Sequence, residues 1–182
     1  MKEIRFVDIQ SAGADMQEKV RLWRNTGRIR RSMVNQHEIS SKEHAKWLDT
    51  LKNSESRKFW IVYVDQVPIG SVYLQDINYD DLSSEWGFYI GDERYLGQGL
   101  GKDILYTLLE LVFEKMKLKV LITRVLSDNA QALSLYKKFD FIELDKLPYK
   151  NDITLNLLRF SREDWFKFKG EQTDGGIGKN RE

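Results

Sequence analysis

The stretch "RYLGQGLGKD", residues 94–103, places three glycines within five positions, between an aromatic β-rich run and a long apolar helical run. Glycine has no Cβ, so a ligand can approach its backbone closely and its φ can be positive. The first N–H groups of the following helix, at the positive end of its dipole, are donors for an anion. The pattern therefore predicts an α/β domain with a phosphate-binding turn between strand and helix. A purely structural turn is the alternative.

Two familiar phosphate loops do not fit this spacing. A Walker A loop needs glycine where Leu96 stands, and serine or threonine after Lys102, where Asp103 stands. The dinucleotide fingerprint is G-x-G-x-x-G with an acidic residue about twenty positions further on, whereas this loop reads G-x-G-x-G and lacks that residue. The loop therefore needs another explanation.

Hydrophobic periodicity divides the rest of the chain into strands and helices. Strands are expected at 3–9, 59–64, 69–77, 84–90, 119–126 and 153–160, and helices at 14–25, 39–52, 104–116, 129–139 and 161–168. Segment 26–39 has no clear period and is expected to be a loop or short helices. Consecutive strands in the middle favour antiparallel pairing, and the strand, helix, strand order around 84–126 predicts a right-handed crossover with parallel pairing.

Composition limits the possible classes of function. Residues 1–169 suit one soluble α/β domain, and the glycine-rich, charged segment 170–182 is expected to be disordered. A net charge of +1 argues against nucleic acid as a partner. The chain has no cysteine, which excludes disulfides, thiolate metal ligands and a cysteine acyl-enzyme, and we expect no metal. Without an apolar run long enough for a membrane span or a signal peptide, the expected location is cytoplasmic.

A second motif, "DNAQALSLYKKFDF" at 128–141, decides the interpretation of the glycine loop. It matches the N-x-x-A-x-x-L-Y-x-x-x-G-F signature of the GCN5-related N-acetyltransferases, the GNAT family, and the chain resembles that family from about residue 4 to 166. The resemblance implies an α/β (α+β) fold with a central mixed, mostly antiparallel sheet and helices on both faces. It also implies acetyl-CoA as co-substrate, held at its pyrophosphate by the glycine loop.

The resemblance carries site residues with it. The cofactor site it implies comprises Ile90, Leu96, Gly97, Gln98, Gly99, Leu100, Gly101, Lys102, Asn129, Ala132 and Tyr136. Asn129 would form a hydrogen bond with the cofactor arm, and Tyr136 would protonate the departing thiolate. The alternative for Tyr136 is that it is an aromatic residue packed in the core. Two positions depart from the family pattern. Leu96 stands where many members have Arg or Gln, and Asp140 replaces the signature glycine, although aspartate tolerates left-handed turns.

Acyl transfer from a thioester to an amine needs a polarised carbonyl, a neutral amine and an acid for the sulfur, without a covalent enzyme intermediate. Tyrosine suits the acid role because its reference pKa of about 10 keeps it protonated. Glu85 is the candidate base, and structural pairing with an arginine is an equal alternative. Gly87, inside the same strand, predicts a β-bulge that would present a backbone N–H to the thioester.

Segment 22–51, with "PIGSVYLQDI" and "EWGFYIGDE", bears a finer resemblance, to GNAT enzymes of pseudaminic acid biosynthesis that acetylate the 4-amino group of a UDP-linked amino-deoxy sugar. By that likeness Arg30, Arg31, Met33 and His44 border the substrate, and guanidinium groups could grip its diphosphate in bidentate fashion. The alternative for the two arginines is that they form a solvent-exposed face. The alternative for His44 is that it is partly buried and makes its hydrogen bonds within the protein.

Three other functions stay open. These are acetylation of protein N-termini, as in ribosomal-protein acetyltransferases, acetylation of polyamines, and non-catalytic acetyl-CoA binding by a regulator. A polyamine would call for carboxylates rather than arginines, and a regulator would be expected to lose the acid that Tyr136 supplies. The expected assembly is a monomer or a homodimer, and no membrane partner is expected.

Overall fold

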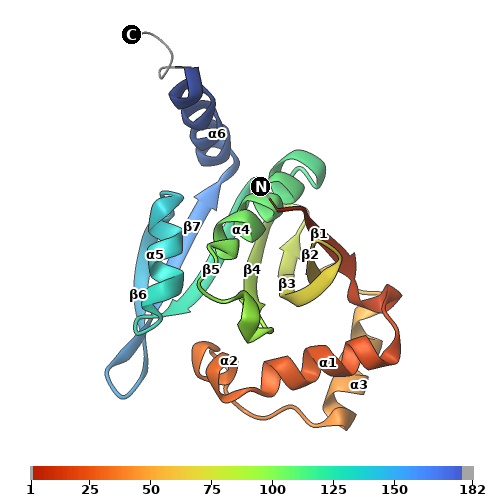
Figure 1. Cartoon of the computed structure of the whole chain (residues 1–182). Coiled ribbons are helices and arrows are strands. Elements are labelled where there is room, and N and C mark those ends of the chain that lie inside the picture. The colour runs from red at the N-terminus through yellow and green to blue at the C-terminus, as the bar shows by residue number, and fades with distance from the viewer. Residues whose placement is uncertain (1, 178–182) are drawn as a thin grey trace.

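The computed structural model describes residues 2–177 of the chain, and its centre is a seven-stranded mixed sheet (Figure 1). The strands are β1 (Ile4–Asp8), β2 (Lys58–Val64), β3 (Val67–Asn78), β4 (Ser83–Ile90), β5 (Val120–Leu126), β6 (Ile142–Lys150) and β7 (Ile153–Ser161). Their order is β1-β2-β3-β4-β5-β7-β6. The β4–β5 pair is parallel and the other pairs are antiparallel. The mixed, mostly antiparallel α/β fold is therefore confirmed.

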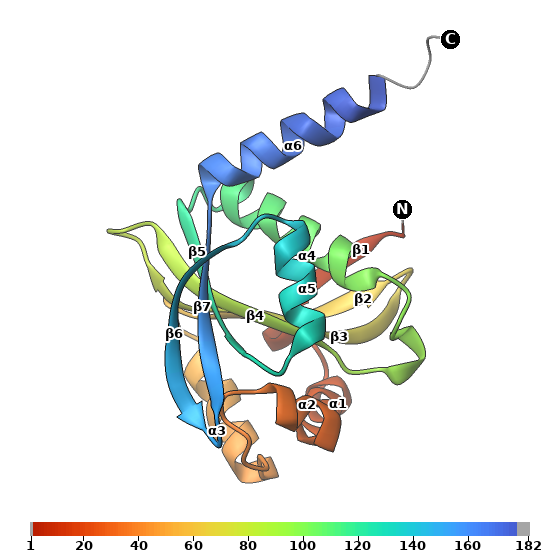
Figure 2. The same cartoon turned by 90° about the vertical axis from the view of Figure 1, so that its left-hand side faces the viewer.

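Helices cover both faces of this sheet (Figures 1 and 2). They are α1 (Ala14–Asn25), α2 (Gly27–Ser32), α3 (Ser41–Leu51), α4 (Leu100–Glu110), α5 (Ala130–Lys138) and α6 (Arg162–Ile177), and a π-helical segment, Leu111–Lys115, prolongs α4. Successive strand residues point to opposite faces, so Ile61 packs with α1, α2 and α3 whereas Val62 packs with α4, α5 and α6. Two apolar cores result, one on each side of the sheet.

Local sequence signals position several of these elements. Ser40 and Glu43 form the predicted capping box of α3: Glu43 N–H donates to Ser40 Oγ at 3.2 Å, and Ser40 N–H donates to Glu43 Oε2 at 2.7 Å. The β2–β3 hairpin turns through Asp65 and Gln66, both with positive φ. Asp140 has a φ of 58°, and Phe141 N–H reaches the Tyr136 carbonyl at 3.1 Å, so aspartate does replace glycine in this turn.

Two segments differ from the sequence expectation. Strand β6 was not predicted, because it is a sheet edge whose side chains are nearly all exposed and show no apolar alternation. Helix α6 extends to Ile177 and so enters the segment 170–182 that was expected to be disordered; residues 178–182 lie outside the described part. Within residues 2–177 no helix has the length and apolarity that crossing a bilayer requires.

Candidate active site

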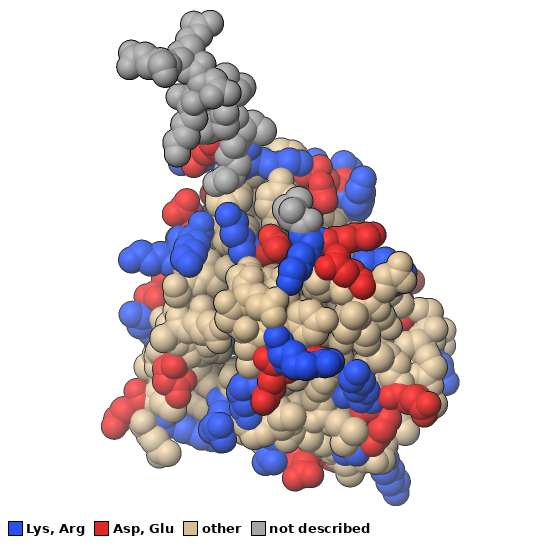
Figure 3. All heavy atoms as spheres, in the orientation of Figure 1, with Lys and Arg blue, Asp and Glu red and all other residues tan. Residues whose placement is uncertain are grey.

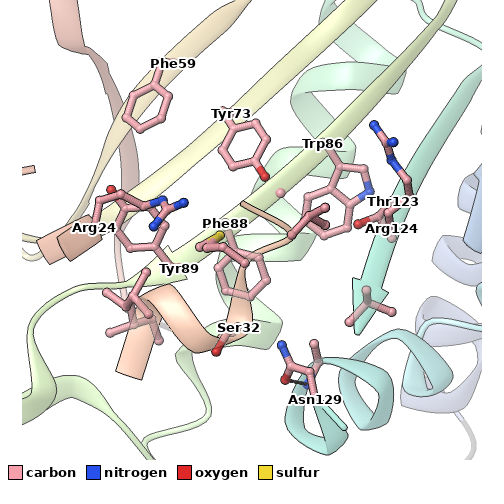
Figure 4. Close-up of a pocket in the computed structure, with 18 of the residues that line it drawn as sticks. Arg24, Ser32, Phe59, Tyr73, Trp86, Phe88, Tyr89, Thr123, Arg124 and Asn129 are labelled. Carbon is pink, nitrogen blue, oxygen red and sulfur yellow. Dashed lines mark hydrogen bonds between the residues drawn. The ribbon is translucent and has the colours of Figure 1, made fainter. Parts of the chain in front are cut away.

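The cavity at the centre of the molecule exists because β4 and β5 separate. Their paired register covers Ser83–Glu85 against Val120–Ile122, and β4 then continues to Ile90 beside β3. A cavity of about 980 Å³ occupies this fork (Figure 4). Phe88 and Tyr89 both line it, although their side chains belong to opposite faces of the sheet. The fork therefore connects the α4–α5 side of the sheet with the α1–α3 side.

The glycine loop between β4 and α4 lines this cavity with backbone. Gly97 and Gly99 have φ values of +70° and +75°, and a Cβ added at either would meet no atom within 4 Å. Glycine is thus needed for the conformation of the loop, while the space beside it is open to a ligand. Gly99 is the N-cap of α4, and the first-turn amides of Leu100 and Gly101 have no acceptor within the helix. The loop can therefore donate several N–H groups to a pyrophosphate.

All the predicted cofactor residues except Gln98 line the cavity. The Gln98 side chain is used within the protein instead: its Nε2 donates to the Arg94 carbonyl at 2.7 Å, and its Oε1 accepts from Lys2 Nζ at 2.8 Å. Gln98 can contribute to an anion site through its backbone alone.

Helix α5 supplies Asn129 and Tyr136 to the same cavity. Asn129 caps the helix by accepting from Ala132 N–H at 3.1 Å, which leaves its amide nitrogen for a ligand (Figure 4). Tyr136 is 5% exposed and meets the Trp86 ring edge-on, with centroids 5.4 Å apart. Burial raises the pKa of Tyr136 well above its ordinary value, although its hydrogen bond with Thr123 opposes part of the change. The phenol therefore stays protonated, as an acid for a leaving thiolate must.

The β-bulge predicted at Gly87 is absent from the β3–β4 pair, which is in regular register from Gln75–Glu85 to Gly70–Ile90. Glycine is required at position 87 for a different reason. A Cβ at Gly87 would lie 2.4 Å from the hydroxyl oxygen of Tyr73, its cross-strand partner. Glycine is needed because Tyr73 reaches over β4 at this point, and the amides beyond the fork are exposed by strand separation rather than by a bulge.

Glu85 is the last residue of β4 that pairs with β5. It lines the cavity, where it forms an ion pair with Arg124 of β5. Arg124 Nε donates to Glu85 Oε1 at 3.2 Å, and its Nη2 donates to Oε2. The carboxylate raises the pKa of Arg124 further above its ordinary value. The arginine pairing considered as an alternative for Glu85 is thus present, and it holds the carboxylate at the fork.

A family model described as an acetyltransferase (GNAT) domain matches residues 9–142, a span that includes the glycine loop, the fork and α5. The chain belongs to the GNAT acetyltransferases. It is therefore an acetyl-CoA-dependent N-acetyltransferase, and the amide-rich glycine loop fits the pyrophosphate of that co-substrate. Among the described residues, no three His, Asp or Glu side chains are grouped so that they could hold a metal ion.

The relatives of this acetyltransferase have different names. A curated protein named acetyltransferase PseH, from Campylobacter jejuni subsp. jejuni serotype O:2, is 31% identical over 125 residues, which is 68% of this chain and 75% of the relative. The structure of C. jejuni PseH in complex with acetyl coenzyme A aligns with a TM-score of 0.67 at 23% identity, over 87% of this chain and 99% of the other. The structure of Vibrio cholerae spermidine N-acetyltransferase in complex with CoA and spermine aligns with a TM-score of 0.79 at 18% identity, over 91% of this chain and 98% of the other.

The predicted substrate residues of this GNAT enzyme separate into two groups. Met33 and His44 line the cavity. His44 is also satisfied internally, because its Nε2 lies 2.9 Å from the Gln17 carbonyl oxygen. Arg30 and Arg31 are not in the lining: Arg30 Nε donates to the Gln36 carbonyl at 3.0 Å, and Arg31 is exposed. The helical turn of α2 points these two side chains away from the cavity.

Other arginines line the cavity in their place, and sequence reasoning missed them. Arg21 and Arg24 of α1 and Arg28 of α2 line it. Arg21 and Arg24 are one helical turn apart, but the extended residue Thr26 separates Arg28 from α1, so helical spacing does not predict that all three share one side. Tyr73 was missed as well, because only the cross-strand register shows it opposite Gly87.

Proposed function

We propose that this enzyme transfers the acetyl group of acetyl-CoA directly, in a ternary complex, to the 4-amino group of a UDP-linked amino-deoxy sugar. The observation that carries the proposal is the charge of the cavity lining. Its basic residues are Arg21, Arg24, Arg28, Arg57, Lys58, Lys102, Arg124 and Lys138, and its carboxylates are Glu43 and Glu85. On the face seen in Figure 3, by contrast, basic and acidic side chains are interspersed. A nucleotide sugar brings the anionic diphosphate that such a lining favours.

Arg24 is the best-placed group for that diphosphate. Its Nη2 donates to the Asn35 carbonyl, whereas its buried Nη1 has no hydrogen-bond partner. Burial lowers the pKa of Arg24 from its ordinary value, and no carboxylate pairs with it within the described residues. An unpaired buried donor is costly to fold, and a bound phosphate oxygen would satisfy it. The Nε of Arg28 is also buried without a hydrogen-bond partner, but it forms an ion pair with Glu93 at 3.5 Å, so Arg28 is less available than Arg24.

The catalytic roles that we propose follow from the positions of the side chains around the fork. We assign Tyr136 as the acid that protonates the CoA thiolate and Glu85 as the base, because Glu85 stands at the fork where β4 leaves β5, whereas Glu43 belongs to the capping box of α3. The ion pair with Arg124 holds the Glu85 carboxylate at the fork, where it can accept the proton that the amine loses.

A polyamine is the second candidate acceptor, and the fold likeness to the V. cholerae spermidine enzyme is the observation in its favour. A polycation needs unpaired carboxylates in the site. Both carboxylates of this lining are already engaged by other side chains. Three of its arginines are ion-paired too, Arg21, Arg28 and Arg124, but its other cations pair with no carboxylate within the described residues, so the charge of the cavity favours the nucleotide sugar.

The experiment compares Arg24→Gln with Arg31→Gln, an exposed arginine outside the lining. Charge-assisted hydrogen bonds contribute about 1.5 to 3 kcal/mol, so Arg24→Gln should lower kcat/KM for the UDP-amino sugar by about tenfold to a hundredfold. The Kd for acetyl-CoA should not change, and free UDP should compete with the sugar in wild type and more weakly in Arg24→Gln. Equal kinetics for both variants, or no competition by UDP, would reject the proposal.

A further inference from the structure

Tyr73 is a cavity residue that the family signature does not mark. It lies on β3, where its ring is parallel to that of Phe59, with centroids 6.0 Å apart. Its hydroxyl points into the cavity (Figure 4). No described residue makes a hydrogen bond to this hydroxyl, whereas the Tyr89 hydroxyl, also in the lining, has the Val20 carbonyl within 3.5 Å. The Tyr73 oxygen is therefore available to a ligand.

The pairing of β3 with β4 places this hydroxyl at the fork. Tyr73 is opposite Gly87, and the nearest atoms to a Cβ built on Gly87 are the hydroxyl oxygen, Cζ and Cε1 of Tyr73, at 2.4, 2.6 and 3.1 Å. The far end of the side chain thus lies over β4, and only glycine leaves room for it. Glu85, two residues before Gly87, points to the same face of the strand. The hydroxyl and the carboxylate therefore lie on the same side of the sheet as Tyr89, facing α1–α3, without a direct hydrogen bond between them.

We propose that Tyr73 is a further catalytic residue, whose hydroxyl accepts a hydrogen bond from the attacking amine and relays a proton to Glu85 through a water molecule. As the N–C bond forms and the C–S bond breaks, the amine proton moves to the Tyr73 oxygen, and the phenolic proton passes through that water to the Glu85 carboxylate. Tyr136 gives its proton to the CoA sulfur. Proton exchange through solvent from Glu85 to Tyr136 restores the enzyme. This inference rests on the N-acetyltransferase activity and not on the identity of the acceptor.

The surroundings of Tyr73 suit this role. Burial, with a smaller effect of the Glu85 charge, raises the pKa of Tyr73 to about 12, while Arg24 and Arg124 oppose the change. The phenol is therefore neutral at physiological pH and has both a lone pair for the amine and a proton to pass on. A tyrosinate at this position would lack the proton, and a phenylalanine would lack both properties.

The test compares Tyr73→Phe with Tyr63→Phe, using whichever amine wild type acetylates fastest. Tyr63 packs against the same apolar core, but it lies outside the cavity lining. Tyr73→Phe should lower kcat by about tenfold to a hundredfold, with the Kd for acetyl-CoA and the Tm close to wild type. Tyr63→Phe should not lower kcat. Turnover of Tyr73→Phe within about threefold of wild type would overturn the proposal.

Two further measurements separate a relay from a packing role. The loss in Tyr73→Phe should shrink as the pH rises, because hydroxide can then take the amine proton, and a loss independent of pH would contradict the relay. Gly87→Ala displaces the hydroxyl without removing it, so it should also slow turnover. The double variant should be no slower than the slower single variant, because both changes remove one function. Additive losses would contradict the shared role.

Discussion

Among single residues, the acid proposed for the leaving sulfur gives the first prediction. Tyr136→Phe keeps the packing against Trp86 and Phe141 and removes only the hydroxyl. We expect kcat to fall by about 10² to 10⁴ while the Kd for acetyl-CoA changes little. Steady-state kinetics and calorimetric titration check this. Turnover near the wild-type rate would remove Tyr136 from the mechanism.

A second prediction at the residue scale concerns stability and pH. Burial lowers the pKa of His44 below its ordinary value, although its hydrogen bond to the Gln17 carbonyl opposes part of the change. The unfolded chain therefore binds this proton more tightly than the folded one does. The stabilisation is complete above the unfolded pKa of about 6.5 and is lost as the pH falls through the lower folded value.

The measurement is Tm between pH 8 and pH 5 for wild type and His44→Gln, which has an amide donor but does not titrate in this range. The Tm of wild type should fall below about pH 6.5, and the fall should be smaller in His44→Gln. Parallel curves would contradict the assignment of this pH dependence to His44.

Residue types and motif spacing could predict most of the residues from the glycine loop and α5 that line the cavity, because their placement depends on backbone conformation and on short-range helical spacing. The substrate side depends on the direction in which each turn of α1 and α2 points. Arg30 and Arg31 were expected at the substrate, yet the side chains in the lining are those of Arg21, Arg24 and Arg28. No local pattern gives that orientation where a segment lacks a clear period.

The sequence predicts best the segment that runs from strand β4 through the glycine loop into helix α4. Gly99→Val would place a side chain in the open space beside the N-terminus of α4 and force a β-branched residue to a φ of +75°. We expect the Kd for acetyl-CoA to rise more than about tenfold, equivalent to roughly 1.4 kcal/mol. Gly13→Val, at the open N-cap of α1, is the matched control and should leave that Kd unchanged. Wild-type affinity in a folded Gly99→Val variant would reject the pyrophosphate loop.

Elements with weaker amphipathic signals were harder to predict. Edge strand β6 has Ile142, Leu144 and Leu147 exposed, so burial imposes no alternation on its sequence. The glycines near the end of α6 disfavour a helix by propensity, and the helix nevertheless continues to Ile177. The buried strands and α4 were predictable because each has an apolar pattern that the two cores require.

In the whole molecule, one cavity is lined by residues from both sides of the sheet, and this arrangement predicts direct transfer between two substrates bound there together. Initial rates at varied acetyl-CoA and amine should give intersecting rather than parallel lines, because no cysteine is present to form an acyl-enzyme. Mass spectrometry of enzyme incubated with acetyl-CoA alone should find no acetylated catalytic side chain. Parallel lines together with a stable acetyl-enzyme would contradict the ternary mechanism.

The charge of the cavity lining should decide which amine the whole enzyme accepts. Thiol release from acetyl-CoA should be measured with UDP-linked amino-deoxy sugars, spermidine and spermine, and peptides with free N-termini, each at several concentrations. The account predicts that a UDP-amino sugar gives the highest kcat/KM and that free UDP inhibits its acetylation competitively. A higher kcat/KM for a polyamine or a peptide N-terminus, with no inhibition by UDP, would contradict it.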